Sequence, residues 1–240
     1  MLIDNSVCIG CESCIVYCPM GAIISGPTGV AIEREACVEC NICRHADVCP
    51  TDALVAEEHE WPRAVRRVFS DPLATHASTN VPGRGTEEMK TNEVTGRIRH
   101  GWAGVAVELG RPGTGTTFRD VEKVAMAVAK HRIIFERQNP VCGLMTDETG
   151  KIRDDILEEK VLSAIVEFVA PLEAVADVLQ TIRDVSEEID TVFSVDLACR
   201  VSPEGEIPAV AVASAAGMTV SINGKVNVGL GRPRAGEDAP

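Results

Sequence analysis

The hydrophobic pattern in the middle of the chain changes from strand to helix and back to strand. Residues 104–109 form a short valine-rich run that predicts a strand, and residues 132–137 predict a second. Between them, residues 118–131 repeat apolar positions at helical spacing, with Thr116 or Thr117 placed to cap the start of the helix. The apolar face of this helix comprises Val121, Val124, Ala125, Val128 and Ala129.

The same order of patterns recurs further along the chain. Residues 161–170 predict a strand, 172–189 a helix with an apolar seam, and 191–201 another strand. Two consecutive βαβ halves specify a four-stranded antiparallel sheet covered by two helices, a split βαβ sandwich of ferredoxin-like or ACT-like shape. We therefore predict an α+β protein. The seam comprises Leu172, Val175, Val178, Leu179, Ile182, Val185 and Ile189.

Changes in composition predict four parts. Residues 1–60 are rich in cysteine, 61–100 are an irregular connector rich in proline, glycine and arginine, and 101–203 carry the βαβ repeats. Residues 204–240 predict a short helix, a hairpin turned at Asn223-Gly224, and a mobile end.

Charge is distributed unevenly among these parts. Residues 1–60 contain ten Asp or Glu against two Arg, a net charge of −8 out of −13 for the chain. This disfavours nucleic acid as a partner, because a duplex-binding face needs the opposite sign. An acidic surface suits steering toward a basic redox partner, although net charge also keeps a protein soluble. Residues 61–100 carry a net charge of +3, so the connector could fold back on the acidic part and either line a cofactor or partner site or form an ordered packing belt.

No membrane or export signal is recognisable. The chain has no run of about eighteen apolar residues, and its first residues lack the basic region of a signal peptide. We expect a cytoplasmic protein without a membrane span.

Two cysteine runs carry the strongest chemical signal. They are Cys8-x2-Cys11-x2-Cys14-x3-Cys18-Pro19 and Cys37-x2-Cys40-x2-Cys43-x5-Cys49-Pro50. Three thiolates on one tight loop and a fourth beside a proline are typical ligands of a 4Fe-4S cluster. Structural zinc sites are the alternative, but they usually present their cysteines as two pairs. Disulfides fit poorly, because cysteines this close on a tight loop lack the required geometry. The runs predict two 4Fe-4S clusters and electron transfer.

This segment resembles the bacterial two-cluster ferredoxins, in which the fourth cysteine of each run ligates the other cluster. The crossing implies that loss of one cluster unfolds the other. The second run departs from the pattern, because five residues, 44–48, separate Cys43 from Cys49, two more than usual. This insertion lengthens the loop beside the second cluster and could alter the reduction potential of that cluster or the docking of a partner there. The implied ligands are Cys8, Cys11, Cys14 and Cys49 for the first cluster, and Cys37, Cys40, Cys43 and Cys18 for the second.

Residues beside the cysteines have several open roles. His45 could be a proton-coupled partner, a substitute ligand or a solvated loop residue. The last is favoured, because the set of cysteine ligands is already complete. Tyr17 packs on a cluster or, the preferred interpretation, fills the small core. Apolar neighbours are expected to exclude water from the clusters and so influence their reduction potentials; these are Ile9, Ile15, Val16, Ala22, Ile23, Ala53 and Leu54.

Other candidate residues give weaker signals. Glu108 and Glu167 could form a catalytic carboxylate pair, but as polar positions in strands they are expected to face solvent on the open side of the sheet. Loop 110–117 could cradle a phosphate, yet it has neither Walker nor Rossmann spacing, so a flexible loop is favoured. Cys142 and Cys199 are expected to be small buried residues rather than ligands or nucleophiles.

Four further segments lie outside the cysteine runs: Trp61–Arg63, Phe69–Pro72, Asn80–Asn92 and Glu108–Gly115. Together with the cysteines they resemble proteins related to 6-hydroxynicotinate reductase. The resemblance implies a ferredoxin-dependent iron–sulfur flavoprotein of anaerobic nicotinate breakdown. It assigns no role to these segments, and the chain is shorter than a full reductase of this kind. A flavin is an alternative that no sequence motif supports.

Three functions follow from these observations. The first is an iron–sulfur electron-transfer protein or subunit that delivers low-potential electrons to a partner, a flavoprotein or another oxidoreductase subunit. The second is a ferredoxin-dependent reductase that holds a flavin or substrate near residues 81–117. The third is a regulator whose sandwich senses a small ligand and gates the electron carrier. We favour the first, an electron-transfer component rather than a complete enzyme.

Overall fold

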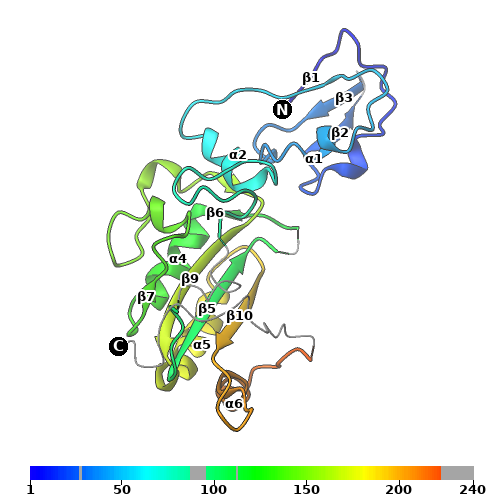
Figure 1. Cartoon of the computed structure of the whole chain (residues 1–240). Coiled ribbons are helices and arrows are strands. Elements are labelled where there is room, and N and C mark those ends of the chain that lie inside the picture. The colour runs from blue at the N-terminus through cyan, green and yellow to red at the C-terminus, as the bar shows by residue number, and fades with distance from the viewer. Residues whose placement is uncertain (27–28, 87–95, 112, 223–240) are drawn as a thin grey trace.

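The structure, a computed structural model, describes residues 1–26, 29–86, 96–111 and 113–222. The cysteine-rich part lies at one end of the molecule and a sheet with its helices at the other (Figure 1). Helix α2 (Ala64–Ser70) lies between the two. The protein is therefore of mixed α+β class.

The cysteine-rich part contains short elements around a small core. Strand β1 pairs with β4, and β2 pairs with β3, both antiparallel. Its buried residues are few, so the stability of this part depends on what fills the spaces between its cysteines. The elements are β1 (Leu2–Ile3), η1 (Ile15–Tyr17), β2 (Ile23–Gly26), β3 (Gly29–Ile32), α1 (Ile42–His45) and β4 (Leu54–Val55).

The larger part is built on a four-stranded antiparallel sheet of order β10-β5-β9-β7. Helix α4 connects β5 to β7 and helix α5 connects β9 to β10, so each connection passes over a strand of the other half. The two predicted βαβ halves therefore interleave. The elements are β5 (Trp102–Leu109), α4 (Phe118–Val128), β7 (Ile134–Phe135), β9 (Ala164–Pro171), α5 (Leu172–Ser186) and β10 (Phe193–Cys199), with turns η3 (Cys142–Leu144) and η4 (Asp154–Ile156).

Helices α4 and α5 bury the predicted apolar faces against one side of this sheet. The start of α4 is capped as expected, because Thr117 Oγ1 accepts a hydrogen bond from the Asp120 backbone N–H at 3.3 Å. Both helices end about one turn before the predicted boundary, where backbone hydrogen bonds become turn-like at Ala129 and Glu187.

Three predicted strands were too long, and the one expected over 191–201 is limited to β10. The strand expected over 132–137 is limited to β7. The strand expected over 161–170 divides into β9 and a short strand β8 (Lys160–Val161), which pairs with β6 (Thr116–Thr117). The ladder breaks at Leu162, because its backbone N–H donates to Ser70 Oγ at 2.8 Å instead of to a neighbouring strand.

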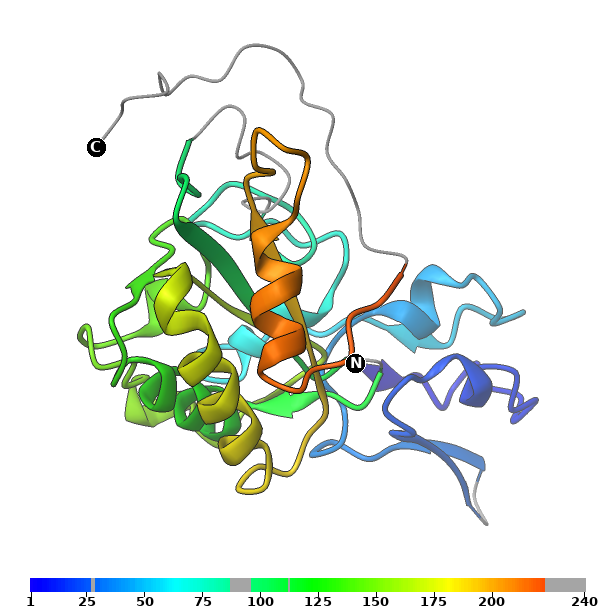
Figure 2. The same cartoon turned by 90° about the horizontal axis from the view of Figure 1, so that it is seen from below.

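Helix α6 (Pro208–Ala215) lies below β10 in the view of Figure 1 and extends the helical layer beside α5 (Figure 2). Its buried Ala209 and Ala213 face this layer, and Ala213 contacts the apolar cluster that contains Val175 and Leu179. The predicted short helix is present, whereas the hairpin expected at Asn223-Gly224 lies outside the described residues.

The connector expected to be irregular contains helix α2, which packs into the main core. Val65 and Phe69 are buried, and the Phe69 ring meets Phe118 edge to face at a centroid distance of 5.2 Å. The sequence prediction missed this helix because prolines on both sides interrupt the pattern. The connector is thus partly an ordered packing belt.

The connector also covers the sheet face opposite the helices. Arg84 forms an ion pair with Glu108, Thr86 donates a hydrogen bond to Glu167, and Arg97 Nη1 lies 2.8 Å from Glu136 Oε2. The expectation that Glu108 and Glu167 face solvent was therefore wrong. Both lie on the predicted face, but Glu167 is buried at 5% exposure because connector residues pair with it.

Candidate functional site

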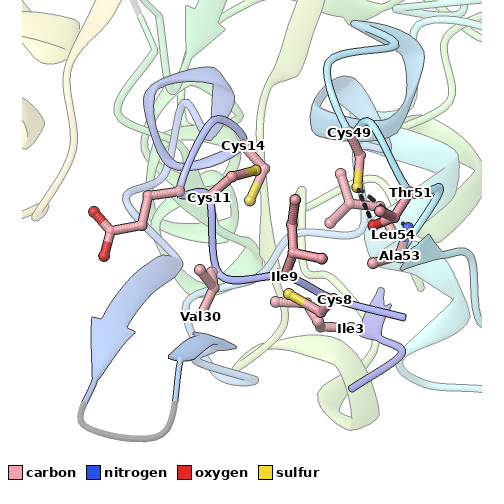
Figure 3. A pocket seen from close by; sticks show the side chains of 11 residues that line it. Ile3, Cys8, Ile9, Cys11, Cys14, Val30, Cys49, Thr51, Ala53 and Leu54 are labelled. Atoms are coloured by element: carbon pink, nitrogen blue, oxygen red, sulfur yellow. Dashed lines mark hydrogen bonds between the residues drawn. The ribbon is translucent and has the colours of Figure 1, made fainter. Parts of the chain in front are cut away.

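The first cysteine cavity is lined by Cys8, Cys11, Cys14 and Cys49. Figure 3 shows Cys11 and Cys14 on one side of Ile9, Cys49 on the other side, and Cys8 below Ile9. The Cys49 Sγ accepts a hydrogen bond from the backbone N–H of Ala53 at 3.2 Å. The fourth cysteine is thus held by the turn after its proline.

The second cavity is lined by Cys18, Cys37, Cys40 and Cys43. It repeats the first in detail, because the Cys18 Sγ accepts a hydrogen bond from the Ala22 N–H, also at 3.2 Å. The two cavities are equally small, with volumes of about 20 Å³ each. Each cavity is therefore lined by three cysteines of one run and one cysteine of the other.

Left-handed backbone conformations shape both cysteine loops. Gly10 and Glu12 flank Cys11 with φ of 68° and 63°, and Glu39 and Asn41 flank Cys40 with φ of 56° each. Such alternation turns successive backbone N–H groups toward one concave side, where they favour negative charge. Three of these four residues are not glycine, so the loops maintain a conformation that is costly for ordinary side chains.

The thiols of the two cavities differ in their electrostatics. Burial raises the pKa of Cys40 to about 12 and that of Cys43 to about 11. In the first cavity, a hydrogen bond with the Ser13 side chain lowers the pKa of Cys11. Hydrogen bonds with the backbone of Thr51 and Ala53 lower the pKa of Cys49. Burial also raises the pKa of Cys14 in the first cavity, but Cys40 and Cys43 are buried whereas Cys11 is exposed, so the thiolates of the second cavity depend more on a bound cation.

A buried carboxylate lies beside the second cavity. Burial would raise the pKa of Glu39, but the Met1 amine and Arg63 outweigh burial and lower the pKa to about 2. The Arg63 Nη2 donates to Glu39 Oε1 at 2.7 Å. This ion pair holds the left-handed residue between Cys37 and Cys40 in place.

The apolar residues expected to shield the clusters fall into two groups. Ala22, Ile23, Ala53 and Leu54 are buried as predicted, and Ile15 is partly buried. Ile9 and Val16 are 67% and 84% exposed, and Tyr17 is 43% exposed rather than part of the core. Val16 and Tyr17 are therefore not part of the core, because the loop that carries them lies on the outer side of the molecule (Figure 1), whereas Ile9 lines the first cavity despite its exposure.

His45 and its neighbours connect the insertion to residue 71. The His45 Nε2 lies 3.2 Å from Asp71 Oδ1, and the Asn41 amide donates to Asp71 Oδ2 at 2.8 Å. His45 is exposed, as expected of a solvated residue, and its ring also contacts Asp71 at the boundary between the two parts. It does not line either cysteine cavity.

The sequence interpretation missed Arg63 and Arg66. Arg66 is buried, donates to the backbone carbonyl oxygens of Glu35 and Cys37 at 3.0 Å each, and pairs with Glu159 of the sheet part. Arg63 and Arg66 are three residues apart, so a helix would place both side chains on the same face. This spacing, with Arg67 directly after it, could have identified the two arginines.

The glycine-rich loop 110–117 meets the cysteine-rich part. A side-chain Cβ at Gly115 would lie 2.7 Å from Met20 Cε, and Met20 lines the second cavity. Gly115 has a φ of 71°, and its carbonyl accepts from Thr191 Oγ1 at 2.7 Å. Within its described residues, the loop makes a packing contact beside the second cavity.

The two remaining cysteines lie in the sheet part. Burial raises the pKa of Cys142 to about 12, and Cys199 Sγ accepts from the Ala209 N–H at 3.4 Å. Both are partly buried, in agreement with the expected packing roles.

A separate pocket of about 470 Å³ opens on the sheet face opposite the helices. Trp102, Gly104 and Val169 line it from β5 and β9, and arginines surround its polar side. Burial raises the pKa of Glu167 at its inner wall. The full lining is Arg97, Ile98, Arg99, Trp102, Gly104, Ile134, Phe135, Glu136, Arg137, Gln138, Glu167, Phe168 and Val169.

Two features are absent from the described part of the chain. No three His, Cys, Asp or Glu side chains there converge on a position that could hold one metal ion. None of its helices combines the length and apolar character needed to cross a membrane.

Comparison with known proteins identifies the class of the N-terminal part. A 4Fe-4S binding domain model matches residues 1–24. The pyruvate synthase subunit PorD of Methanocaldococcus jannaschii is 35% identical over 60 residues, which cover 25% of this chain and 67% of that protein. A ferredoxin of Alicyclobacillus acidocaldarius is 38% identical over 56 residues, or 22% of this chain and 69% of that protein. This part is a ferredoxin-like iron–sulfur domain for electron transfer.

A third relative is the probable iron-sulfur subunit of the Frd operon of Proteus vulgaris. It is 33% identical over a match covering 24% of this chain and 48% of that protein, so the chain spans about half of its length. Through its first quarter, the chain belongs to the 4Fe-4S ferredoxin family. No solved structure matches the chain.

Proposed function

We propose that residues 1–60 hold two 4Fe-4S clusters and that the chain is an electron-transfer subunit delivering low-potential electrons to a partner oxidoreductase. The observation that carries this proposal is the presence of two cavities, each lined by four cysteines. In each, three cysteines come from one run and the fourth from the other. Two of the relatives are named as subunits, one of pyruvate synthase and one of the Frd operon, and these names support a partner oxidoreductase.

The residues of this chain have separate roles in the proposed function. A 4Fe-4S cluster supplies reversible one-electron storage when bound. Cys8, Cys11, Cys14 and Cys49 would hold the first cluster, and Cys37, Cys40, Cys43 and Cys18 the second. The buried Ala22, Ile23 and Leu54 limit the access of water, and backbone N–H groups at Ala22 and Ala53 stabilise thiolate charge.

We also infer that the sheet part is a split βαβ sandwich of ferredoxin-like topology. The strand order β10-β5-β9-β7, with a helix connecting β5 to β7 and another connecting β9 to β10, supports this inference. Its proposed limits are residues 101–203, after a basic connector over 61–100 and before a C-terminal segment over 204–240. A fold of this kind does not itself define a function.

Metal and sulfide analysis tests the proposed clusters. Anaerobically purified protein should be brown and contain about eight iron and about eight sulfide ions per chain. It should be reduced by dithionite and reoxidised without loss of iron. About four iron ions would contradict the second cluster, and near-stoichiometric zinc without sulfide would contradict both.

The sheet pocket supports small-molecule binding as a second candidate function. Its volume of about 470 Å³ suits a ligand of cofactor or metabolite size. Trp102 offers a flat surface and Arg99 and Arg137 are exposed cations, so a ring compound with a carboxylate or phosphate fits this chemistry. Part of the lining lies within 81–117, where a reductase would hold flavin or substrate.

Two measurements distinguish these alternatives. Yellow flavin released from the purified protein by acid would favour a reductase, and its absence would favour an electron carrier. Thermal stabilisation by a ring carboxylate without any turnover would favour a ligand-gated carrier. No stabilisation by carboxylates, phosphates or flavin mononucleotide would count against ligand binding in this pocket.

A further inference from the structure

The two cysteine cavities differ in how much of their surroundings is exposed. Cys11 is exposed, and Ile9, which lines the first cavity, is 67% exposed. In the second cavity Cys40 and Cys43 are buried. Soluble proteins rarely leave large apolar side chains together on one surface unless a partner covers them. The exposed apolar residues beside the cysteines of the first run are Val7 and Ile9, which flank Cys8, and Val16 and Tyr17, which lie between Cys14 and Cys18 in the chain; they are here called the outer face.

Residues beyond the cysteine-rich part cover the second cavity. The Arg66 Nη1 donates to the carbonyl oxygen of Cys37 at 3.0 Å, and Met20 lies against Gly115. The described hydrogen bonds of the residues lining the first cavity stay within residues 1–60. The dark-blue loop that follows the N-terminal strand extends away from the sheet part in both views (Figures 1 and 2). A partner protein can therefore approach the first cavity more closely than the second.

Charge distinguishes the two sides as well. Near the second cavity, Arg63 and Arg66 neutralise Glu39 and Glu35, with N–O distances of 2.7 and 3.4 Å. Near the first cavity, Glu12 lines the wall, and Asp4 and Asp52 adjoin lining residues. These three acidic residues have no ion pair to a basic residue among the described contacts, and this leaves negative charge around the outer face.

We propose that a redox protein with basic residues around an apolar, exposed redox group docks on the outer face and exchanges electrons through the first site. This inference rests on the proposed function. Each docking event transfers one electron from the reduced first site to the partner's acceptor group, with no bond made or broken. The second site would then exchange electrons with that partner only by way of the first, because electron transfer slows steeply with distance.

Cytochrome c is a suitable probe because it is a basic protein with an exposed haem edge. Its zinc-substituted form allows binding to be measured by fluorescence without electron transfer. Ile9→Lys should weaken this binding at least tenfold in low salt, because the substitution removes apolar contact and adds a repelling charge. Val16→Lys should act in the same direction, and because this position is 84% exposed the substitution should leave folding intact. The matched control is Leu73→Lys, at a 70% exposed position outside the cysteine-rich part.

The expected result is a loss of affinity for both outer-face variants and a change below twofold for Leu73→Lys. The second-order rate of cytochrome c reduction should fall in the same order and decrease with added salt. Equal weakening by all three substitutions, or no effect of Ile9→Lys and Val16→Lys in proteins that retain iron and sulfide, would overturn the docking proposal. Absence of iron and sulfide from the unsubstituted protein would instead refute the proposed function, and the zinc-form binding data would still report on docking.

Discussion

Arg66 donates a hydrogen bond from Nη1 to the backbone carbonyl oxygen of Cys37 at 3.0 Å. The same guanidinium pairs with Glu159 in the sheet part. A buried arginine is tolerated only when charged and polar partners replace its lost hydration. One side chain therefore fixes the start of the second cysteine run relative to the sheet, and the geometry of the second site depends on the contact between the two parts.

Replacing this arginine should destabilise the whole protein. Arg66→Ala leaves Glu159 and two backbone carbonyls without their donor, and breaking a buried ion pair in this way costs about 3–5 kcal/mol. We expect a lower thermal midpoint and faster release of iron on heating. Differential scanning fluorimetry together with iron release under anaerobic conditions measures both.

Arg67→Ala is the matched control for this prediction. Arg67 follows Arg66 in the same helix but is 43% exposed; it lies 3.5 Å from the buried Asp71, and its ion pair with Glu58 is also 3.5 Å long and solvated. A surface pair of this kind contributes up to about 1 kcal/mol. Similar midpoints for the two variants would show that the Arg66 contacts do not stabilise the second run.

The crossed arrangement of cysteines makes a prediction about pairs of variants. Cys18→Ala should weaken first the same electron paramagnetic resonance signal as Cys40→Ala, before any linked loss of the other cluster, because both residues line the second cavity although they lie in different runs. Cys49→Ala should match Cys11→Ala for the first cavity. Spectra of the four reduced variants, with their iron contents, test the pairing. If Cys18→Ala matches Cys11→Ala instead, each run forms its own site and the crossed assignment is wrong.

Gly115 provides a test of the contact between the two parts. Alanine there would place Cβ 2.7 Å from Met20 Cε and 2.9 Å from the Val161 carbonyl oxygen, at a φ of 71°. Met20 can move but the Val161 backbone cannot, so Gly115→Ala should cost about 2–4 kcal/mol through overpacking and backbone strain. The change in the midpoint of urea denaturation measures this cost.

Gly113→Ala separates strain from contact. Gly113 has a similar φ of 64°, but an alanine Cβ at this position would meet no atom within 4 Å. It should therefore cost only about 1 kcal/mol. Equal effects of the two substitutions would mean that the loop does not press against Met20 and Val161 in solution.

The sequence predicted the parts of this protein that depend on local spacing. Cysteine spacing indicated which side chains would gather, and alternating patterns indicated the strands and both long helices. The exposure of the Ile9 and Val16 side chains could not be predicted from local spacing. It depends on which side of their loop is covered by other parts of the chain. The same holds for Glu167, whose burial results from a hydrogen bond with Thr86, far away in sequence.

Helix α2 shows a second reason for failure. Its seven residues lie between prolines, and its apolar positions Val65 and Phe69 are too few to show a helical period. Their burial against Phe118 stabilises the helix, so tertiary packing determines an element that local propensity leaves open.

Glu167 should give the stability of the sheet part a distinct dependence on pH. Burial raises the pKa of this carboxyl, and hydrogen bonds from Thr86 and Asn139 only partly oppose the effect. A carboxyl whose pKa is higher in the folded than in the unfolded protein stabilises the fold below its ordinary pKa, and that stabilisation is lost as pH rises through the folded value.

Glu167→Gln keeps an oxygen that can accept both hydrogen bonds but does not titrate. The variant should therefore gain stability relative to the unsubstituted protein as pH rises from about 5 to about 8, measured by thermal unfolding at constant ionic strength. Glu108→Gln, on the neighbouring strand of the same face, controls for the loss of a carboxylate, and a stability difference for Glu167→Gln that stays constant with pH would contradict the prediction.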